Sequence, residues 1–332
     1  MNKNFTIALL SLALAVIATE ADAQRYIKVM RYGTVGVNIG AINYFGDIVP
    51  KPTYTSLRFK STQPTIGISY SYRLAPRIAV KGALNLGRII GDDALSASSN
   101  EGEDLGRLKR NLSFRNDIEE LSALAVFDLY ENRRPYQYRP DFVPYAFVGL
   151  AVFHHNPKAY YEKGSRPGLD PANDIPTGWY ELQPLGTEGQ YASQDGSTYP
   201  TPYKRLQIAI PFGLGVRYRI DRYMDVSLEV NWRKTFTDYL DDVSTSFVDK
   251  ALLLNDYGSS NDKASAILSD RSAESGFETV EDPSGTVYDV VPGYGTSLNP
   301  YRGDDSGKDW YITTSISLSY IIPPRIRSPK FR

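Results

Sequence analysis

Two adjacent histidines, His154 and His155, are the only histidines in the sequence and the first candidates for chemistry. A histidine can serve as the base for a serine nucleophile or bind a metal ion. These two follow an alternating apolar stretch, and neighbouring residues of a strand point to opposite faces. They therefore cannot chelate one metal ion, and no serine motif stands beside them. We expect no catalytic residues and no cofactor, and we interpret the pair as rim histidines at the end of a strand.

Three aspartates, Asp238, Asp241 and Asp242, crowd one end of another alternating stretch. Such carboxylates can hold Ca²⁺ or bridge the phosphates of lipopolysaccharide through divalent ions. They can also form turns and pair with basic side chains. The basic candidates are Lys109, Arg110 and Arg115. We favour the second interpretation because no regular ligand spacing appears.

A second polar motif, GTEGQ, comprises Gly186, Thr187, Glu188, Gly189 and Gln190. Its glycines indicate a tight turn in a long loop. Exposed there, Glu188 and Gln190 could contact a secreted substrate or another surface protein. The later tripeptide Arg302-Gly303-Asp304 is one that some host receptors read, but in a Gly- and Asp-rich loop we attribute it to chance.

The N-terminus directs the chain out of the cytoplasm. Residues 1–23 contain Lys3, an apolar run and Ala21-Asp22-Ala23, which are typical of a secretory signal cleaved between Ala23 and Gln24. The 332-residue chain has no cysteine, so we expect neither a lipid anchor nor disulfides. Its net charge of −1 argues against bulk nucleic-acid binding.

Eight segments alternate bulky apolar residues with small or polar ones, which predicts β-strands. They lie near residues 32–44, 64–74, 77–90, 111–130, 143–153, 206–220, 224–236 and 310–322. Each is long enough to cross a bilayer at a tilt, which takes roughly 9–11 residues. The connections at 75–77 and 221–223 are short and that after the fourth strand is moderate. The long connections span residues 45–63, 91–110, 154–205 and 237–309.

Short turns at one end and long loops at the other are typical of outer-membrane barrels. We therefore predict an all-β, eight-stranded antiparallel transmembrane barrel over residues 24–322. Its short turns would face the periplasm, its long loops the exterior, and its wall outer-membrane lipids and lipopolysaccharide. The alternative is a secreted β-sandwich. Even strand number, loop asymmetry and export together favour the barrel.

The lumen of an eight-stranded barrel is just wide enough to be filled by side chains. Several charged residues alternate with the apolar face and should point inward and pair. These are Arg73, Lys81, Glu120, Asp128, Arg217, Glu229 and Arg233. We expect a charged plug rather than a conducting pore.

Residues 323–332 form a basic tail that begins with Pro323 and Pro324. Prolines cannot extend the strand ladder, so the tail should leave the barrel wall on the periplasmic side. Its basic residues would join those of the turn after the fourth strand. The set is Arg325, Arg327, Lys330 and Arg332 with Arg133, Arg134 and Arg139. It could attract an acidic partner or the anionic inner leaflet, and the other interpretation is an unstructured stub.

Several longer stretches resemble one family of outer-membrane barrels. They include YELQPLGTEGQ, IPFGLGVRYR and FTDYLDDVSTSFVD, together with INYFGDI, RNLSFRNDIEE and RGDDSGKDWYI. These stretches resemble the PorG-like barrels of Bacteroidetes over nearly all of the mature chain. The resemblance implies a non-enzymatic component of the type IX secretion machinery that docks a periplasmic ring of PorK- and PorN-like proteins. The alternatives are a surface adhesin or receptor acting through the long loops, and a lipid-active barrel enzyme.

Overall fold

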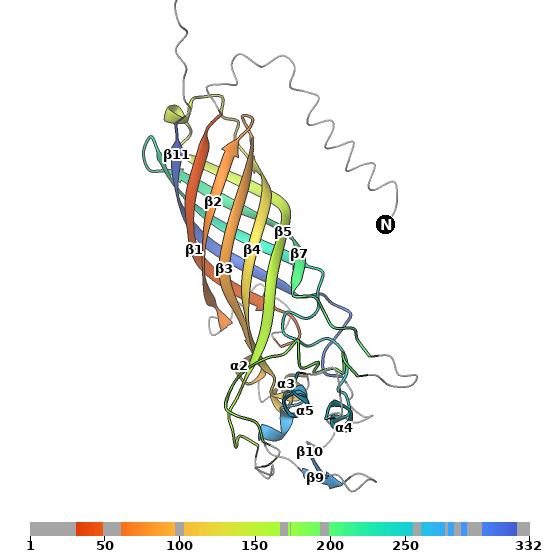
Figure 1. The fold of residues 1–332 in the computed structure, drawn as a ribbon. Helices are drawn as coiled ribbons and strands as arrows, with labels where there is room; N and C mark the ends of the chain where they lie inside the picture. The colour runs from red at the N-terminus through yellow and green to blue at the C-terminus, as the bar shows by residue number, and fades with distance from the viewer. Residues whose placement is uncertain are drawn as a thin grey trace, which may run out of the picture.

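Figure 1 shows the fold of the chain in a computed structural model. The residues that the structure describes are 31–48, 61–96, 103–166, 172, 174–192, 199–254, 260–275, 278–281, 287–290 and 301–323. The predicted signal peptide, with its cleavage site between Ala23 and Gln24, lies outside the described residues. So do the tail residues from Pro324 onward.

Eight long strands form a closed antiparallel barrel, as predicted. They are β1 (Gly33–Phe45), β2 (Gln63–Arg73), β3 (Ile78–Asp92), β4 (Ser113–Asp128), β5 (Phe142–Tyr161), β7 (Leu206–Arg219), β8 (Met224–Thr235) and β11 (Trp310–Ile322). Each of these strands pairs with the previous and the next one in the chain, and β11 pairs with β1 to close the ring. Closure leaves no unpaired edge, which is the condition for a sheet to cross lipid.

The two ends of the barrel differ in their connections (Figure 1). The turns β2–β3, β4–β5 and β7–β8 lie at one end, called here the short-turn end. Gly33 of β1 pairs with Ile322 of β11 at this same end, so both ends of the barrel sequence lie there. The other end, called the long-loop end, carries the four long connections.

The outer wall of the barrel is apolar. Leucine, isoleucine, valine and aromatic side chains alternate outward on every strand, and many are more than 40% exposed in the isolated chain. On β7 and β8, Leu214 is 61% and Leu228 is 44% exposed, whereas Ser227 faces inward at 8%. A continuous apolar exterior of this kind is suited to hydrocarbon rather than water. The predicted assignment of faces is confirmed on these strands.

Smaller elements occupy connections that the sequence pattern left as loops. They are α2 (Asp93–Ser96), α3 (Glu103–Arg110), β6 (Gly178–Glu181), α4 (Lys250–Leu253), α5 (Asp262–Ser269), β9 (Glu278–Glu281), β10 (Val287–Val290) and the 3-10 helices η3 (Tyr136–Tyr138) and η4 (Ser272–Ser275). Strand β5 continues eight residues beyond the predicted end at Phe153, because β4 and then β6 pair with its extension. Among the described residues, no helix is long and apolar enough to cross a membrane.

Candidate functional site

The lumen is filled by matched ion pairs, as the alternation predicted. Glu120 accepts from Arg233 at 2.5 Å and 3.0 Å, and both side chains are almost fully buried. Lys81 and Glu229 pair at 2.6 Å. Asp128 lies 3.0 Å from Arg73 and 2.8 Å from Arg217. A charge removed from water is tolerated when its partner and further hydrogen bonds are in place.

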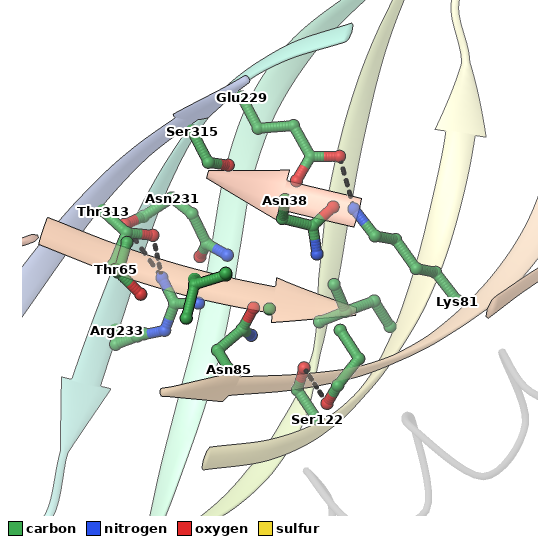
Figure 2. A pocket seen from close by; sticks show the side chains of 14 residues that line it. Asn38, Thr65, Lys81, Asn85, Ser122, Glu229, Asn231, Arg233, Thr313 and Ser315 are labelled. Carbon is green, nitrogen blue, oxygen red and sulfur yellow. Dashed lines mark hydrogen bonds and ion pairs between the residues drawn. The ribbon is translucent and has the colours of Figure 1, made fainter. Parts of the chain in front are cut away.

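Tyrosine and threonine side chains complete this network. Tyr311 donates to Glu120 at 2.7 Å, Tyr145 donates to Glu229 at 2.7 Å, and Arg233 also donates to Thr313. Figure 2 shows the cavity that remains, with Lys81 reaching Glu229 across it. Its volume is about 20 Å³, which is room for one or two waters. Ion pairs and hydrogen bonds therefore fill this part of the lumen as a charged plug.

At the long-loop end, the described parts of the connections within residues 45–63, 91–110, 154–205 and 237–309 form what is called here the cap. Arg302 joins several of these connections. The Arg302 guanidinium donates to Glu188 at 2.9 Å, to the carbonyl of Asp242 and to the carbonyl of Ser269 at 2.9 Å. Arg110 donates in turn to the Arg302 carbonyl at 2.6 Å. These bonds tie together the second, third and fourth long connections. Arg302 is 2% exposed, so the arginine of the Arg-Gly-Asp sequence is buried in the cap, and of the three residues only Asp304 is exposed.

The GTEGQ motif lies inside this cap. Gly186 and Gly189 have φ values of +65° and +75°, which confirms the tight turn that their glycines predicted. Glu188 is fully buried and accepts from the Ser244 amide at 2.9 Å and the Thr245 hydroxyl at 2.7 Å. The expectation that Glu188 and Gln190 face an external partner is therefore not supported, because both residues are buried.

The three aspartates pair differently from the prediction. Asp242 accepts from Thr187 at 2.5 Å and Tyr203 at 2.7 Å, and its nearest cation is Arg302 at 3.8 Å. Asp241 accepts from Tyr44 at 2.7 Å. Asp238 accepts from Ser244 at 2.7 Å and lies 3.8 Å from Lys308.

Pairing with Lys109, Arg110 or Arg115 was thus wrong. Arg110 is held by Asp93 at 2.8 Å through two nitrogens, and Arg115 lies over the ring of Trp179. Lys109 is exposed. The cations that do meet the aspartates, Arg302 and Lys308, come from the far end of the fourth connection, 60 and 70 residues along the chain from Asp242 and Asp238. Among the described residues, no group of three or more acidic or histidine side chains is arranged to hold a metal ion.

In the described part of the cap, carboxylates outnumber cations, and burial shifts the pKa values of several of these carboxylates. Burial raises the pKa of Asp242 to about 6, although Arg302 and two hydroxyl donors act against it. Burial, followed by the charges of neighbouring aspartates, raises the pKa of Asp309 well above its ordinary value. Burial and then the charge of Asp47 do the same for the pKa of Asp241. The Tyr44 hydroxyl lies 2.7 Å from Asp241 and 3.0 Å from Asp309, and its single proton can serve only one of them at a time.

The two histidines lie on opposite faces of β5, as predicted. His154 points outward and is exposed, whereas His155 is fully buried in the cap. Its ring stacks on Tyr203 at 5.7 Å and its nitrogens lie near the Asn116 amide and the Lys204 carbonyl. These described contacts include neither a serine nor a carboxylate that would complete a catalytic group. Because β5 continues beyond them, the histidines are not at the end of the strand.

At the short-turn end, the basic residues of the β4–β5 turn divide into two kinds. Arg139 is 4% exposed, pairs with Asp225 at 2.6 Å and donates to carbonyls of the β7–β8 turn. From the sequence, Arg139 was grouped with the docking residues, but its side chain connects the β4–β5 turn to the β7–β8 turn. Arg133 and Arg134 remain exposed, with Arg133 2.7 Å from Glu131.

Comparisons with known proteins give a family model but no activity. A protein-family model described as a domain of unknown function, DUF6089, matches residues 9–171, which include β1 to β5. The search of curated proteins finds no match. None of the matches described here is to a PorG-like protein.

Solved structures that resemble the chain are outer-membrane barrels of very different sequence. Ail, the attachment invasion locus protein of Yersinia pestis in complex with the heparin analogue sucrose octasulfate, is 7% identical with a TM-score of 0.34, over 88% of this chain and 99% of Ail. Neisserial surface protein A is 8% identical with a TM-score of 0.33, over 87% and 96%. A major outer membrane protein of Thermus thermophilus is 12% identical with a TM-score of 0.34, over 87% and 99%. The closed strand pairing and apolar wall of the chain itself identify it as an eight-stranded outer-membrane β-barrel.

Proposed function

We propose that this protein is a sealed, non-enzymatic outer-membrane barrel that binds a periplasmic partner, as a subunit of a protein secretion apparatus of the type IX class. The observation that carries the proposal is the closed interior. Ion pairs fill the lumen and a hydrogen-bonded cap covers one mouth. A barrel without a path through it acts through its surfaces.

The short-turn end supplies the surface for a periplasmic partner. Here the β4–β5 turn exposes Arg133, Arg134 and Tyr138, of which Tyr138 is 65% exposed. The predicted tail leaves the barrel at the same end, because Ile322 pairs with Gly33 there. Basic groups and an exposed aromatic ring in one turn suit an acidic protein surface. The PorG-like resemblance of the sequence supports a secretion-ring protein as that partner.

The experiment is a pull-down of the tagged protein from detergent-solubilised envelopes of the native host. Wild type should retain a periplasmic partner, and a chain truncated after Ile322 with Arg133→Glu and Arg134→Glu should lose it. The set is changed together because single exposed charge contacts are weak, about 0–1 kcal/mol. Lys109→Glu, at the exposed opposite end, is the matched control.

Heat-modifiable gel mobility shows whether each variant still folds as a barrel. Loss of the partner from a folded variant supports the proposal. Retention of the partner at wild-type yield and salt resistance by the folded variant would contradict it.

A surface receptor or adhesin is the second candidate, and one observation favours it. The cap has its own apolar cluster, in which β5, the GTEGQ loop and α5 contribute Tyr161, Leu185 and Ile267. A folded cap of this kind can present a defined surface to the exterior. Replacing residues 278–290, which hold β9 and β10, by a short Gly-Ser linker should abolish cell-surface adhesion if the receptor function is correct. Partner recovery in the pull-down should be unchanged by that replacement.

A further inference from the structure

A lateral groove lies at the long-loop rim of the barrel wall, between the ends of β1, β8 and β11. Its volume is about 410 Å³, within the range of roughly 300–1,000 Å³ that is common for small-ligand sites. Phe45, Trp232, Trp310 and Ile312 form its apolar walls. Neither the lumen plug nor the periplasmic partner of the proposed function uses this groove.

The aromatic wall places the groove at the edge of the membrane. Phe212 stacks on Trp232 at 6.0 Å and meets the edge of Trp310 at 6.2 Å, on the outer face of the barrel. Trp310 and Tyr320 lie ten residues apart on β11. At about 3.3 Å per residue and a tilt of about 40°, that separation spans about 25 Å, the height of an outer-membrane apolar band. The groove therefore opens sideways at one membrane interface, where lipid has direct access.

The floor of the groove is acidic. It is lined by Asp47, Asp238 and Asp309, with Asp304 at its rim. By comparison, the groove has one lining cation, Lys308. Lys308 is 46% exposed and its amine lies 3.8 Å from Asp238. The Oδ2 atom of Asp47 is buried without a hydrogen-bond partner in the described structure. Partly desolvated carboxylates in excess attract a cation and repel an anion.

The walls also favour a cation. Lys234 already lies over the face of Trp310, with its amine 5.4 Å from the ring centre. The face of an indole ring carries negative potential and attracts ammonium groups. Apolar walls, an acidic floor and aromatic faces together select a molecule with a hydrocarbon body and a positively charged end.

We propose that this groove binds a membrane lipid whose headgroup ends in a primary ammonium. The acyl chain lies along Trp232, Trp310 and Ile312, and the ammonium donates to Asp238 and Asp47. An ammonium has three donors and can satisfy two carboxylates at once. A lipid is the occupant, rather than a soluble peptide, because the groove opens onto the apolar wall of the barrel. A headgroup with only negative charge would meet Asp238 and Asp304 in this acidic lining.

The groove contains two of the three tryptophans in the chain, which gives a direct optical test. In a Trp179→Phe background, all tryptophan emission comes from Trp232 and Trp310. The protein is reconstituted in phosphatidylcholine vesicles with a minor fraction of a lipid carrying brominated acyl chains. The headgroup of that lipid is ethanolamine, choline or phosphatidic acid, with identical chains. Bromine quenches tryptophan only at short range, so quenching reports the lipid in the groove.

The ethanolamine lipid should occupy the groove roughly threefold more tightly than the choline lipid, as expected for a partly exposed ion pair. Asp238→Asn, which keeps an oxygen to accept from Ser244, should bring this ratio close to one, and Asp47→Asn should lower it. Asp117→Asn, at a half-exposed carboxylate paired with Arg88 outside the groove, should leave it unchanged. Equal quenching by all three headgroups would overturn the proposal. A preference for phosphatidic acid, or an ethanolamine preference that survives Asp238→Asn in a heat-modifiable barrel, would overturn it too.

Discussion

The lumen and the cap both bury many charged side chains, but they balance them differently. In the lumen each of Glu120, Glu229 and Asp128 has a cation within 3.0 Å. In the cap Asp241 and Asp309 share one tyrosine hydroxyl, and Asp242 lies 3.8 Å from its cation. The lumen is thus a permanently matched plug, whereas the cap depends on protons and on a few buried guanidinium groups. The two regions should respond differently to mutation and to pH.

Removing one lumen carboxylate should have the largest effect. Glu120→Ala leaves the buried Arg233 guanidinium without its partner, which costs about 3–5 kcal/mol of folding stability. The measurement is urea unfolding of the protein in vesicles. Asp117→Ala, on the same strand but in a half-exposed pair with Arg88, should cost no more than about 1 kcal/mol. Equal losses for the two variants would show that the lumen is hydrated rather than packed.

The cost of placing a charge on the outer barrel wall should depend on depth in the membrane. Leu214→Arg places a charge near the middle of the apolar band and should cost about 2–4 kcal/mol. The yield of heat-modifiable protein after refolding into vesicles measures this loss. Tyr218→Arg, on the same face of β7 but nearer the short-turn end, should cost about 0–1 kcal/mol. The same tolerance at both positions would mean that the outer face has been misassigned.

Breaking the cap should leave the barrel intact. Arg302→Met leaves Glu188 and Asp242 buried without their cation and should cost the closed cap about 1–3 kcal/mol. Limited proteolysis from the long-loop side should become faster, while heat-modifiable mobility is kept. Lys308→Met, at a half-exposed cation, is the control with little effect. If Arg302→Met also abolished barrel folding, the cap and the wall would be one cooperative unit.

The pH response should be smaller and confined to the cap. The pKa values of Asp242, at about 6, and Asp47, at about 7, lie above the ordinary 3.8, so the closed cap binds more protons than an open one. The stability that these bound protons give the closed cap is fully present below the ordinary aspartate pKa of 3.8. It is lost as the pH rises through about 6 to 7, where Asp242 and Asp47 lose their protons in the closed cap. The free energy of opening the cap should fall by about 1 kcal/mol per pH unit over the range in which the closed cap binds one proton more than the open cap.

Hydrogen exchange of the Ser244 and Thr245 amides, compared with amides of β8, measures this difference. Among the described residues, Arg110, Arg302 and Lys308 are cations that lie close to the cap carboxylates. Asp242→Asn should flatten the response. A slope of opposite sign, or an equal slope in β8, would contradict the proton-dependent cap.

The barrel could be predicted from the sequence because its constraints are local. Period-2 alternation fixes which face of each strand meets lipid, and turn length fixes which strands are neighbours. Inward Glu120, Glu229 and Arg233 follow from that alternation, although their pairing partners on other strands follow only from closure.

The cap could not be predicted in this way. Tyr44 and Asp309 are 265 positions apart, and Arg302 and Glu188 are 114 apart. No periodic pattern connects such residues, so the basic partners of the aspartates were sought at Lys109, Arg110 and Arg115, and Arg302 was set aside. The extension of β5 was missed because its partner β6 lies in a connection without alternation. Only the paired glycines of GTEGQ gave a local signal of ordered structure.

The central claim is that the lumen is sealed, and single-channel recording in a planar lipid bilayer tests it most directly. Purified, heat-modifiable protein should insert without opening a steady conductance at moderate voltage, because ion pairs and tyrosines cross the lumen and the cavity beside Lys81 and Glu229 has a volume of only about 20 Å³. Stable ohmic channels from the wild-type protein, absent from a boiled sample, would contradict this account.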